Sequence, residues 1–230
     1  TIGRSVAIAG ATGLTGSLCL QRLLLEPGIS KVVAIGRRVP PTAHPKLSSV
    51  LLVDGRLSER VEVDHFISCL GTTIREAGSQ DRFRAVDLEL PAMLARELHA
   101  AGCHSAGVVS AMGANPESPI FYNRTKGEME EALRGIGFSG LAILRPSLIL
   151  GDREKKRFGE RSFGQLLEAA RPLLRGPLRN LRAIHADDIA RGLVVTSVAP
   201  PSGARVYRSE EIKTLVRPVD KSHDLGMTGP

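Results

Sequence analysis

Aromatic residues are scarce in this chain of 230 residues: they make up 3% of it, with no tryptophan and only two tyrosines. A surface that stacks nucleic-acid bases needs several aromatic side chains, so the scarcity argues against such a partner. The chain also lacks an uninterrupted apolar run of roughly 20 residues, the length that crosses a bilayer. It shows no basic and apolar signal series at its N-terminus, and we therefore expect a soluble, cytoplasmic protein without a membrane span.

Cysteine is rare as well, with three residues, Cys19, Cys69 and Cys103, that lie far apart in apolar runs. Their number is odd and no CxxC or Cys/His spacing joins them, so we expect reduced thiols, with neither a disulfide nor a zinc site. The histidines have no metal-ligand spacing, and no Gly-x-Ser-x-Gly elbow marks a nucleophilic serine. We expect neither metal chemistry nor acyl transfer.

Positive charge is plentiful: the formal net charge is +7, and nine basic residues fall between Arg153 and Arg182. Such a cluster can serve a phosphorylated cofactor, an acidic or phosphorylated small-molecule substrate, or nucleic acid, and it can equally be the solvated face of a helix. The shortage of aromatic residues makes nucleic acid the weakest of these alternatives.

Short runs rich in Val, Ile and Leu alternate with longer stretches of helical periodicity. The expected strands are residues 6–9, 32–35, 50–53, 65–69, 107–109 and 141–144, and the expected helices are residues 14–25, 83–101 and 122–133. Near-continuous apolar strands separated by helices are typical of a parallel sheet covered on both faces. The pattern predicts an α/β fold with a doubly wound parallel sheet. We expect a single domain over residues 1–230, with 151–230 as a variable substrate-side region and polar tail.

The stretch VAIAGATGLTG places three glycines between the first expected strand and the first helix. Glycines permit a tight turn and a close backbone approach, so the free N–H groups and positive dipole end of the helix can face a pyrophosphate. Any tight strand-to-helix turn could use such glycines, but the position at the start of the first βαβ unit favours a dinucleotide site. The expected cradle consists of Gly10, Ala11, Thr12, Gly13, Leu14, Thr15 and Gly16.

The second expected strand ends in VVAIGRRVP, with Arg37 and Arg38 where an NAD site usually carries an acidic residue. Arginine suits the 2′-phosphate of NADP, so the pair favours NADP(H), although two arginines can also be ordinary loop residues. Asp54, after the third expected strand, could accept a hydrogen bond from the adenine amino group or merely cap the following turn.

One of the two tyrosines, Tyr122, lies four residues before Lys126 in SPIFYNRTKGEMEEALRG. We expect a helix here that Ser118 caps, that has Pro119 at its first position and that stops at Gly135. Residues four apart share a helix face, and a nearby ammonium favours the phenolate form of a phenol whose pKa is ordinarily about 10. Tyr122 is therefore a candidate general acid, though the spacing alone is common on exposed helices.

Ser110 follows the fifth expected strand, twelve residues before Tyr122, where the carboxyl edge of a sheet faces the cofactor crevice. Taken in order, GATGLTG, CLGTT, Ser110, YNRTK and LRPSLILGD resemble the short-chain dehydrogenase/reductase superfamily, specifically its atypical branch. Within that branch, AIGRR, YNRTKGEMEEAL and the terminal SHDLG look like the Tat-interacting-protein oxidoreductases. The resemblance implies a Rossmann fold that binds NADP(H).

The same resemblance assigns roles to single residues. It implies that Ser110 orients a substrate carbonyl, that Tyr122 transfers the proton, and that Lys126 holds the nicotinamide ribose and lowers the pKa of Tyr122. It also implies that Leu70 and Gly71 lie beside the cofactor. Backbone against the nicotinamide amide is expected at Pro146, Ser147 and Leu148.

Two features complicate this assignment. The catalytic Asn of the superfamily has no clear counterpart, because CLGTT replaces the motif that often supplies it. The stretch AIHADDIARG resembles a His/Asp element of extended and atypical members, but His185 and Asp187 could either contact the substrate or cap a helix at 189–197.

The leading hypothesis is an NADP(H)-dependent oxidoreductase that moves hydride between the nicotinamide and a carbonyl or conjugated substrate, with Tyr122 as the acid. The alternative is an NADP(H)-binding redox sensor that reports to a protein partner with little or no turnover. We expect a monomer or a homodimer.

Overall fold

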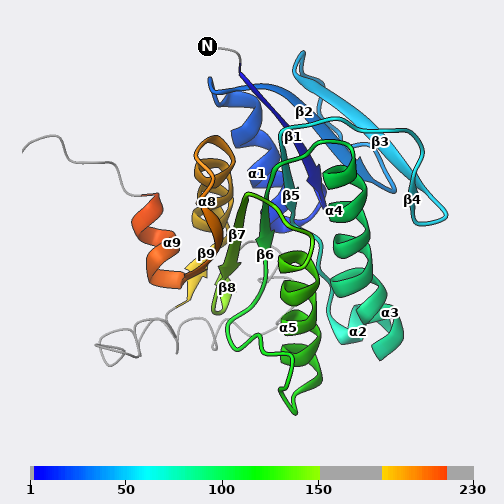
Figure 1. Ribbon diagram of the computed structural model, residues 1–230, viewed down its shortest axis with the longest axis vertical. Coiled ribbons are helices and arrows are strands. Elements are labelled where there is room, and N and C mark those ends of the chain that lie inside the picture. The colour runs from blue at the N-terminus through cyan, green and yellow to red at the C-terminus, as the bar shows by residue number, and fades with distance from the viewer. Residues whose placement is uncertain (1–2, 151–182, 217–230) are drawn as a thin grey trace, which may run out of the picture.

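The computed structural model describes residues 3–150 and 183–216 (Figure 1). Its centre is an eight-stranded sheet in which every neighbouring pair of strands is parallel except β3 and β4. In spatial order the strands are β10 (Gly203–Arg208), β7 (Gly140–Arg145), β6 (Ser105–Val109), β5 (His65–Ser68), β1 (Arg4–Ala9), β2 (Ile29–Gly36), β3 (Leu47–Val53) and β4 (Arg56–Leu57).

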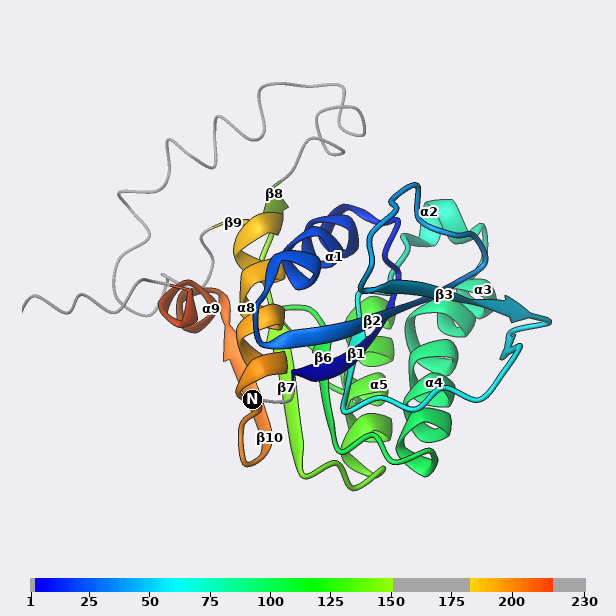
Figure 2. The same cartoon turned by 90° about the horizontal axis from the view of Figure 1, so that it is seen from above.

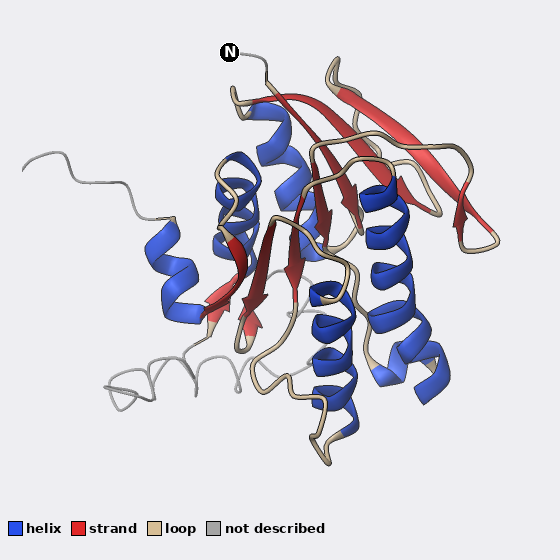
Figure 3. Cartoon of the chain, in the orientation of Figure 1, coloured by secondary structure: helices blue, strands red, loops and turns tan. Residues whose placement is uncertain are grey.

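Helices cover both faces of this sheet, as Figures 2 and 3 show. Helices α1 (Leu14–Leu25) and α8 (Ala186–Val198) lie on one face, and α4 (Leu90–Ala100) and α5 (Phe121–Arg134) lie on the other. The smaller elements are α2 (Ile74–Ala77), α3 (Gln80–Arg84), the π-helix η1 (Ala85–Glu89), α9 (Ser209–Leu215) and a separate two-stranded ladder of β8 (Ile149–Leu150) and β9 (Ile184–His185). No helix in the described ranges is long and apolar enough to cross a bilayer.

The central strands are apolar on both faces because each face meets a layer of helices. In β1, Val6 and Ile8 belong to the core under α1 and α8, whereas Ala7 and Ala9 belong to the core under α4 and α5. The alternation has the period of two expected for a strand. Two apolar cores therefore hold the sheet between its helix layers.

Strand β1 lies at the point where the chain reverses its direction across the sheet. From β1 the chain proceeds outward through β2 and β3, and it then returns to the other side of β1 as β5 and continues outward through β6 and β7. Ligands of open α/β sheets bind in the crevice outside the carboxyl ends of the strands at such a switch point. The fold thus places the glycine-rich loop, which follows β1, at this crevice.

The predicted doubly wound α/β sheet is confirmed, and the helix expected at 122–133 is α5 within one residue at each end. The start expected for that helix is wrong: α5 begins at Phe121 with Ile120 as its N-cap. Ser118 Oγ instead accepts a hydrogen bond from the Ile120 N–H at 3.2 Å, which uses the side chain in the preceding turn. Gly135 ends the helix as expected.

Besides β8 and β9, two strands of the main sheet escaped the sequence analysis. Strand β4 pairs with β3 through the two-residue turn Asp54–Gly55, in which both residues have positive φ, 48° and 78°. Asp-Gly is a typical sequence for such a hairpin turn. Strand β10 joins the edge of the main sheet beside β7, so part of the expected substrate-side region belongs to the central sheet. The basic stretch 153–182 and the tail beyond 216 lie outside the described residues.

Candidate functional site

The glycine-rich loop is packed too closely for side chains at two of its positions. Gly10 has φ +82°, and a Cβ there would lie 2.7 Å from the backbone carbonyl of Cys69. A Cβ on Gly16 would lie 2.0 Å from the carbonyl oxygen of Gly10. The two glycines therefore let the loop contact both the start of α1 and the segment that follows β5.

The start of α1 leaves amide groups available to a ligand. Gly13 is the N-cap and supplies no side-chain cap, and no acidic residue lies in the first turn. The first backbone bond of the helix runs from the Ser17 N–H to the Gly13 carbonyl at 2.9 Å. The N–H groups of Leu14, Thr15 and Gly16 precede this bond and, with the helix dipole, can bind an anion.

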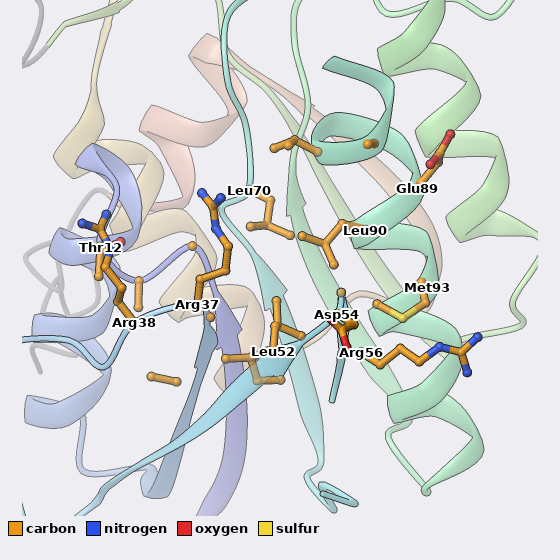
Figure 4. Close-up of a pocket in the computed structure, with 18 of the residues that line it drawn as sticks. Thr12, Arg37, Arg38, Leu52, Asp54, Arg56, Leu70, Glu89, Leu90 and Met93 are labelled. Carbon is orange, nitrogen blue, oxygen red and sulfur yellow. The ribbon is translucent and has the colours of Figure 1, made fainter. Parts of the chain in front are cut away.

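A cavity of about 520 Å³ opens beside this loop (Figure 4). One wall carries Thr12, Arg37 and Arg38, and the opposite wall carries Glu89 and Met93. Both arginines are exposed and form no ion pair with the other described residues. Their guanidinium groups are therefore available to an anionic ligand such as a phosphate.

The cavity gathers about half of the expected cofactor residues. It is lined by Gly10, Ala11, Thr12, Arg37, Arg38, Asp54 and Leu70. The expected residues outside its lining are Gly13, Leu14, Thr15 and Gly16 at the start of α1, Gly71 after β5, and Pro146, Ser147 and Leu148 after β7. Asp54 lies at the tip of the β3–β4 turn with an exposed side chain that lines the cavity.

Tyr122 and Lys126 lie one turn apart on α5, facing the continuous helical run of α3 and η1. The half-buried ring of Tyr122 packs against Phe83, with ring centroids 5.7 Å apart. Lys126 Nζ lies 2.6 Å from Asp87 Oδ1, and both side chains are almost fully buried. Asp87 Oδ1 has no well-aligned hydrogen bond, so this contact acts mainly as an ion pair.

Asp87 also joins Lys126 to the CLGTT segment. Its Oδ2 accepts a hydrogen bond from the Thr72 N–H at 2.8 Å, and a Cβ on Gly71 would lie 3.6 Å from Oδ1. The segment that follows β5 and the lysine of α5 are thus held by one buried carboxylate. The sequence analysis found no clear counterpart of the superfamily's Asn, and the structure shows Asp87 as the buried partner of Lys126.

Ser110 contacts a second buried carboxylate. Its hydroxyl donates to Glu130 Oε1 at 2.5 Å, and Arg145 donates to both Glu130 oxygens, at 2.8 and 2.6 Å. The hydrogen bonds with Glu130 raise the pKa of Arg145 and keep it charged. Because Glu130 accepts this bond, the Ser110 proton points to Glu130, and the lone pairs of the Ser110 oxygen can accept a hydrogen bond from a ligand.

Asp87, Glu130 and Arg145 were missed by the sequence analysis. Glu130 follows Lys126 by four residues and therefore continues the face of α5 that carries Tyr122 and Lys126. Asp87 and Arg145 each interrupt a largely apolar stretch, which is a signal of a buried partner. The partners themselves come from different elements, and no local spacing connects them.

His185 and Asp187 do not cap a helix with their side chains. His185 is the N-cap of α8 without a side-chain cap bond, and its side chain is exposed. Asp187 accepts hydrogen bonds from Nε and Nη2 of Arg22 on α1 at 2.5 to 2.8 Å. His185 thus holds the N-cap position through its backbone alone, and the Asp187 carboxylate joins two helices of the same layer. Within the described ranges, no group of His, Cys, Asp and Glu could hold a metal ion.

Comparison with known proteins gives relatives over almost the whole chain. Protein fmp52, mitochondrial, from Aspergillus fumigatus is 36% identical over 221 residues, which cover 92% of this chain and 94% of that protein. The protein of the same name from Emericella nidulans is 31% identical over 218 residues, which cover 90% of this chain and 93% of that protein. The chain belongs to the Fmp52 family. No protein-family model matches it.

The Fmp52 relatives correct two expectations. The resemblance to short-chain dehydrogenases/reductases agrees with the fold, but the matching curated proteins are named Fmp52 and not Tat-interacting-protein oxidoreductases. The expected cytoplasmic location is wrong, since these relatives are named as mitochondrial proteins. That expectation depended on the lack of a secretory signal and an apolar span, and entry into mitochondria requires neither of them.

Solved structures of the same fold include members of a large oxidoreductase superfamily. A short-chain dehydrogenase/reductase family oxidoreductase from Burkholderia thailandensis superposes with a TM-score of 0.66 at 17% identity, covering 93% of this chain and 94% of its own. MoeE5, solved in complex with UDP-glucose and NAD, superposes with a TM-score of 0.64 at 17% identity, covering 91% of this chain and 80% of its own. At this identity the likeness shows a shared Rossmann-type fold.

Proposed function

We propose that this protein is a mitochondrial, NADP(H)-dependent oxidoreductase of the short-chain dehydrogenase/reductase type. It would transfer hydride between the nicotinamide and a carbonyl or conjugated small molecule. The whole chain would form a single domain. The observation that carries the proposal is the cavity that joins the glycine-rich loop to Arg37 and Arg38 at the switch point of the sheet. The mitochondrial location follows the names of the Fmp52 relatives.

The residues present fit a phosphorylated dinucleotide. Gly10 and Gly16 leave a space that side chains would fill, and the first amides of α1 can bind a pyrophosphate. Arg37 and Arg38 would bind the 2′-phosphate that distinguishes NADP from NAD. Solved neighbours of the same fold include complexes with NAD, which supports a nicotinamide cofactor at this crevice.

The bound nicotinamide would supply or take up the hydride, and the side chains of this chain would position the substrate and move the proton. Tyr122 would donate the proton to the carbonyl oxygen, with the Lys126 ammonium one helical turn away. Ser110 would orient the substrate. Because its own proton is bonded to Glu130, Ser110 would do so as a hydrogen-bond acceptor from the hydroxyl of an alcohol substrate or product.

Calorimetric titration with NADPH and NADH tests the proposal. We expect clear NADPH preference in the unmodified protein. Each of Arg37→Gln and Arg38→Gln should weaken NADPH binding by about ten- to a hundredfold and leave NADH binding unchanged, because each removes a charge-assisted hydrogen bond to the 2′-phosphate. Arg56→Gln is the matched control, since Arg56 is exposed and lines the same cavity from β4.

Three outcomes separate the parts of the proposal. Absence of binding by either dinucleotide would reject it entirely. Equal binding of NADPH and NADH, unchanged by both substitutions, would reject the NADP preference alone. Loss of NADPH affinity in Arg56→Gln equal to that in Arg37→Gln would indicate a general charge effect in place of 2′-phosphate recognition.

A further inference from the structure

Two arginines stand side by side at the carboxyl edge of the sheet, away from the dinucleotide cavity. Arg145 ends β7 and Arg208 ends β10, and the two residues are direct partners in the parallel register. Direct partners point to the same face of a sheet. Ile143 and Val206, two residues earlier in each strand, both pack in the core beneath α4 and α5, so both arginines point to the α5 side.

Within residues 3–150 and 183–216, only one of these two positive charges has an ion-pair partner. Glu130 accepts two hydrogen bonds from Arg145, through Nε and Nη2. Arg208 is exposed, and its side chain forms no ion pair with the described residues. The nearby Glu211 carboxylate accepts a hydrogen bond from the backbone N–H of Arg208 and not from its guanidinium group. Like charges placed directly opposite one another on neighbouring strands are unfavourable, so an additional anion between them would stabilise the pair.

Both arginines line a second cavity, to which the segment just after Ser110 also contributes. Arg145 and Arg208 line it together with Met112 and Gly113, which follow Ser110 by two and three residues. The Ser110 hydroxyl and Arg145 Nε both bond to Glu130 Oε1, so one carboxylate oxygen separates the serine from the arginine. Glu130 therefore links this cavity to Ser110, the residue expected to orient the substrate.

We propose that Arg145 and Arg208 form an anion subsite that selects substrates with an acidic group, a carboxylate or a phosphate, close to the carbon that is reduced or oxidised. Guanidinium groups bind both anions through paired, charge-assisted hydrogen bonds. Met112, whose side chain is 42% exposed, supplies an apolar contact for the short carbon chain between the two groups. The proposal rests on the proposed function in that its natural ligand is the substrate.

The test uses the full chain saturated with NADP+, so that the glycine-rich loop and its arginines are already occupied. Inorganic phosphate and malonate are titrated separately by calorimetry, with sodium chloride as the control for ionic strength. We expect binding of at least one of the two anions at millimolar concentrations. Arg208→Gln should weaken that binding by about ten- to a hundredfold, the value of one charge-assisted hydrogen bond.

Arg205→Gln is the matched control. Arg205 lies on the same strand, but it stacks on Tyr207 at 4.9 Å, on the opposite face, so its removal should leave anion binding unchanged. The proposal is overturned if neither anion binds, or if Arg208→Gln binds as the unmodified protein does or loses no more than Arg205→Gln. Failure of NADP+ to bind in the first step would reject the proposed function separately, and the anion titrations would then be compared among the same variants without cofactor.

Discussion

At the scale of single residues, the site depends on two buried carboxylates that each hold a group expected to act in catalysis. Asp87 pairs with Lys126, and Glu130 accepts a hydrogen bond from the Ser110 hydroxyl. Burial of charge is costly unless the charge is paired, and removal of one partner leaves the other charge without compensation. The strength of these pairs can therefore be measured as stability, without knowledge of the substrate.

Asp87→Asn should lower the free energy of unfolding by about 3–5 kcal/mol, because it leaves the Lys126 ammonium buried without a counter-charge. Adding Lys126→Met to this variant should restore most of the loss. Urea unfolding of both single variants and the double variant gives the coupling energy directly.

The control for this cycle lies on the same helices. Arg84 of α3 and Glu128 of α5 form an ion pair whose side chains are 34% and 31% exposed, so Glu128→Gln should cost less than about 1 kcal/mol. If Asp87→Asn lowered the free energy of unfolding no more than Glu128→Gln, the buried pair would stabilise the fold no more than an exposed pair does.

Tyr122→Phe tests the proposed proton transfer. The substitution removes the hydroxyl but keeps the ring that packs on Phe83, so the fold and the affinity for NADPH should remain unchanged. Turnover of a carbonyl compound, followed by the loss of NADPH absorbance, should fall by about 10²–10⁴-fold, the usual contribution of a general acid. Tyr207→Phe, at the other tyrosine, provides the control, and equal turnover in both variants would remove Tyr122 from the mechanism.

At the scale of elements, the proposed cofactor site depends on how closely the loop after β1 approaches α1. Gly16→Ala would place a Cβ 2.0 Å from the Gly10 carbonyl oxygen, so the loop and the helix would have to separate. We expect NADPH binding to be lost and the free energy of unfolding to fall by about 1–3 kcal/mol, the usual cost of overpacking.

Gly28→Ala is the control for that substitution. A Cβ at Gly28 would meet its nearest neighbours at 3.5 Å, an ordinary contact, in the loop between α1 and β2. Circular dichroism during thermal unfolding and calorimetry with NADPH should show no change in this variant. Normal NADPH affinity in Gly16→Ala would mean that the loop does not act as the cradle.

At the scale of the whole molecule, stability should depend on pH through a residue far from the site. His65 begins β5, at the opposite end of the strands from the crevice, and is fully buried with Nδ1 2.8 Å from Ser105 Oγ. Burial, with a smaller effect of Arg4, lowers its pKa from 6.5 to about 3. The folded protein therefore keeps His65 neutral at a pH where the unfolded chain binds a proton.

The sign follows from linkage: between pH 6.5 and 3 the unfolded state holds the additional proton, so acidification favours unfolding. The free energy of unfolding should fall by about 2 kcal/mol from pH 7 to pH 5. Urea unfolding at a series of pH values measures this slope, and His65→Gln should flatten it. Asp64, whose pKa is lowered from 3.8 by bonds from Ser5, contributes in the same direction only at more acidic pH.

Local sequence patterns predicted much of the fold and part of the candidate site. The apolar runs predicted the parallel sheet, and VAIAGATGLTG predicted the turn between β1 and α1, because a strand, a glycine turn and a helix are defined by neighbouring residues. The Arg37–Arg38 pair could be placed at the crevice for the same reason. The start of α5 was misplaced because Ser118 has two local uses for its hydroxyl, and the sequence does not decide between them.

Tertiary structure alone decided which distant groups meet. Asp87 against Lys126, Glu130 between Ser110 and Arg145, and Arg208 beside Arg145 each join segments that come together only when the sheet forms. Such contacts depend on strand order and register, and these arise from the packing of the whole chain. The sequence by itself therefore determined the fold class and the candidate chemistry, whereas the tertiary structure decided how each reactive group is held.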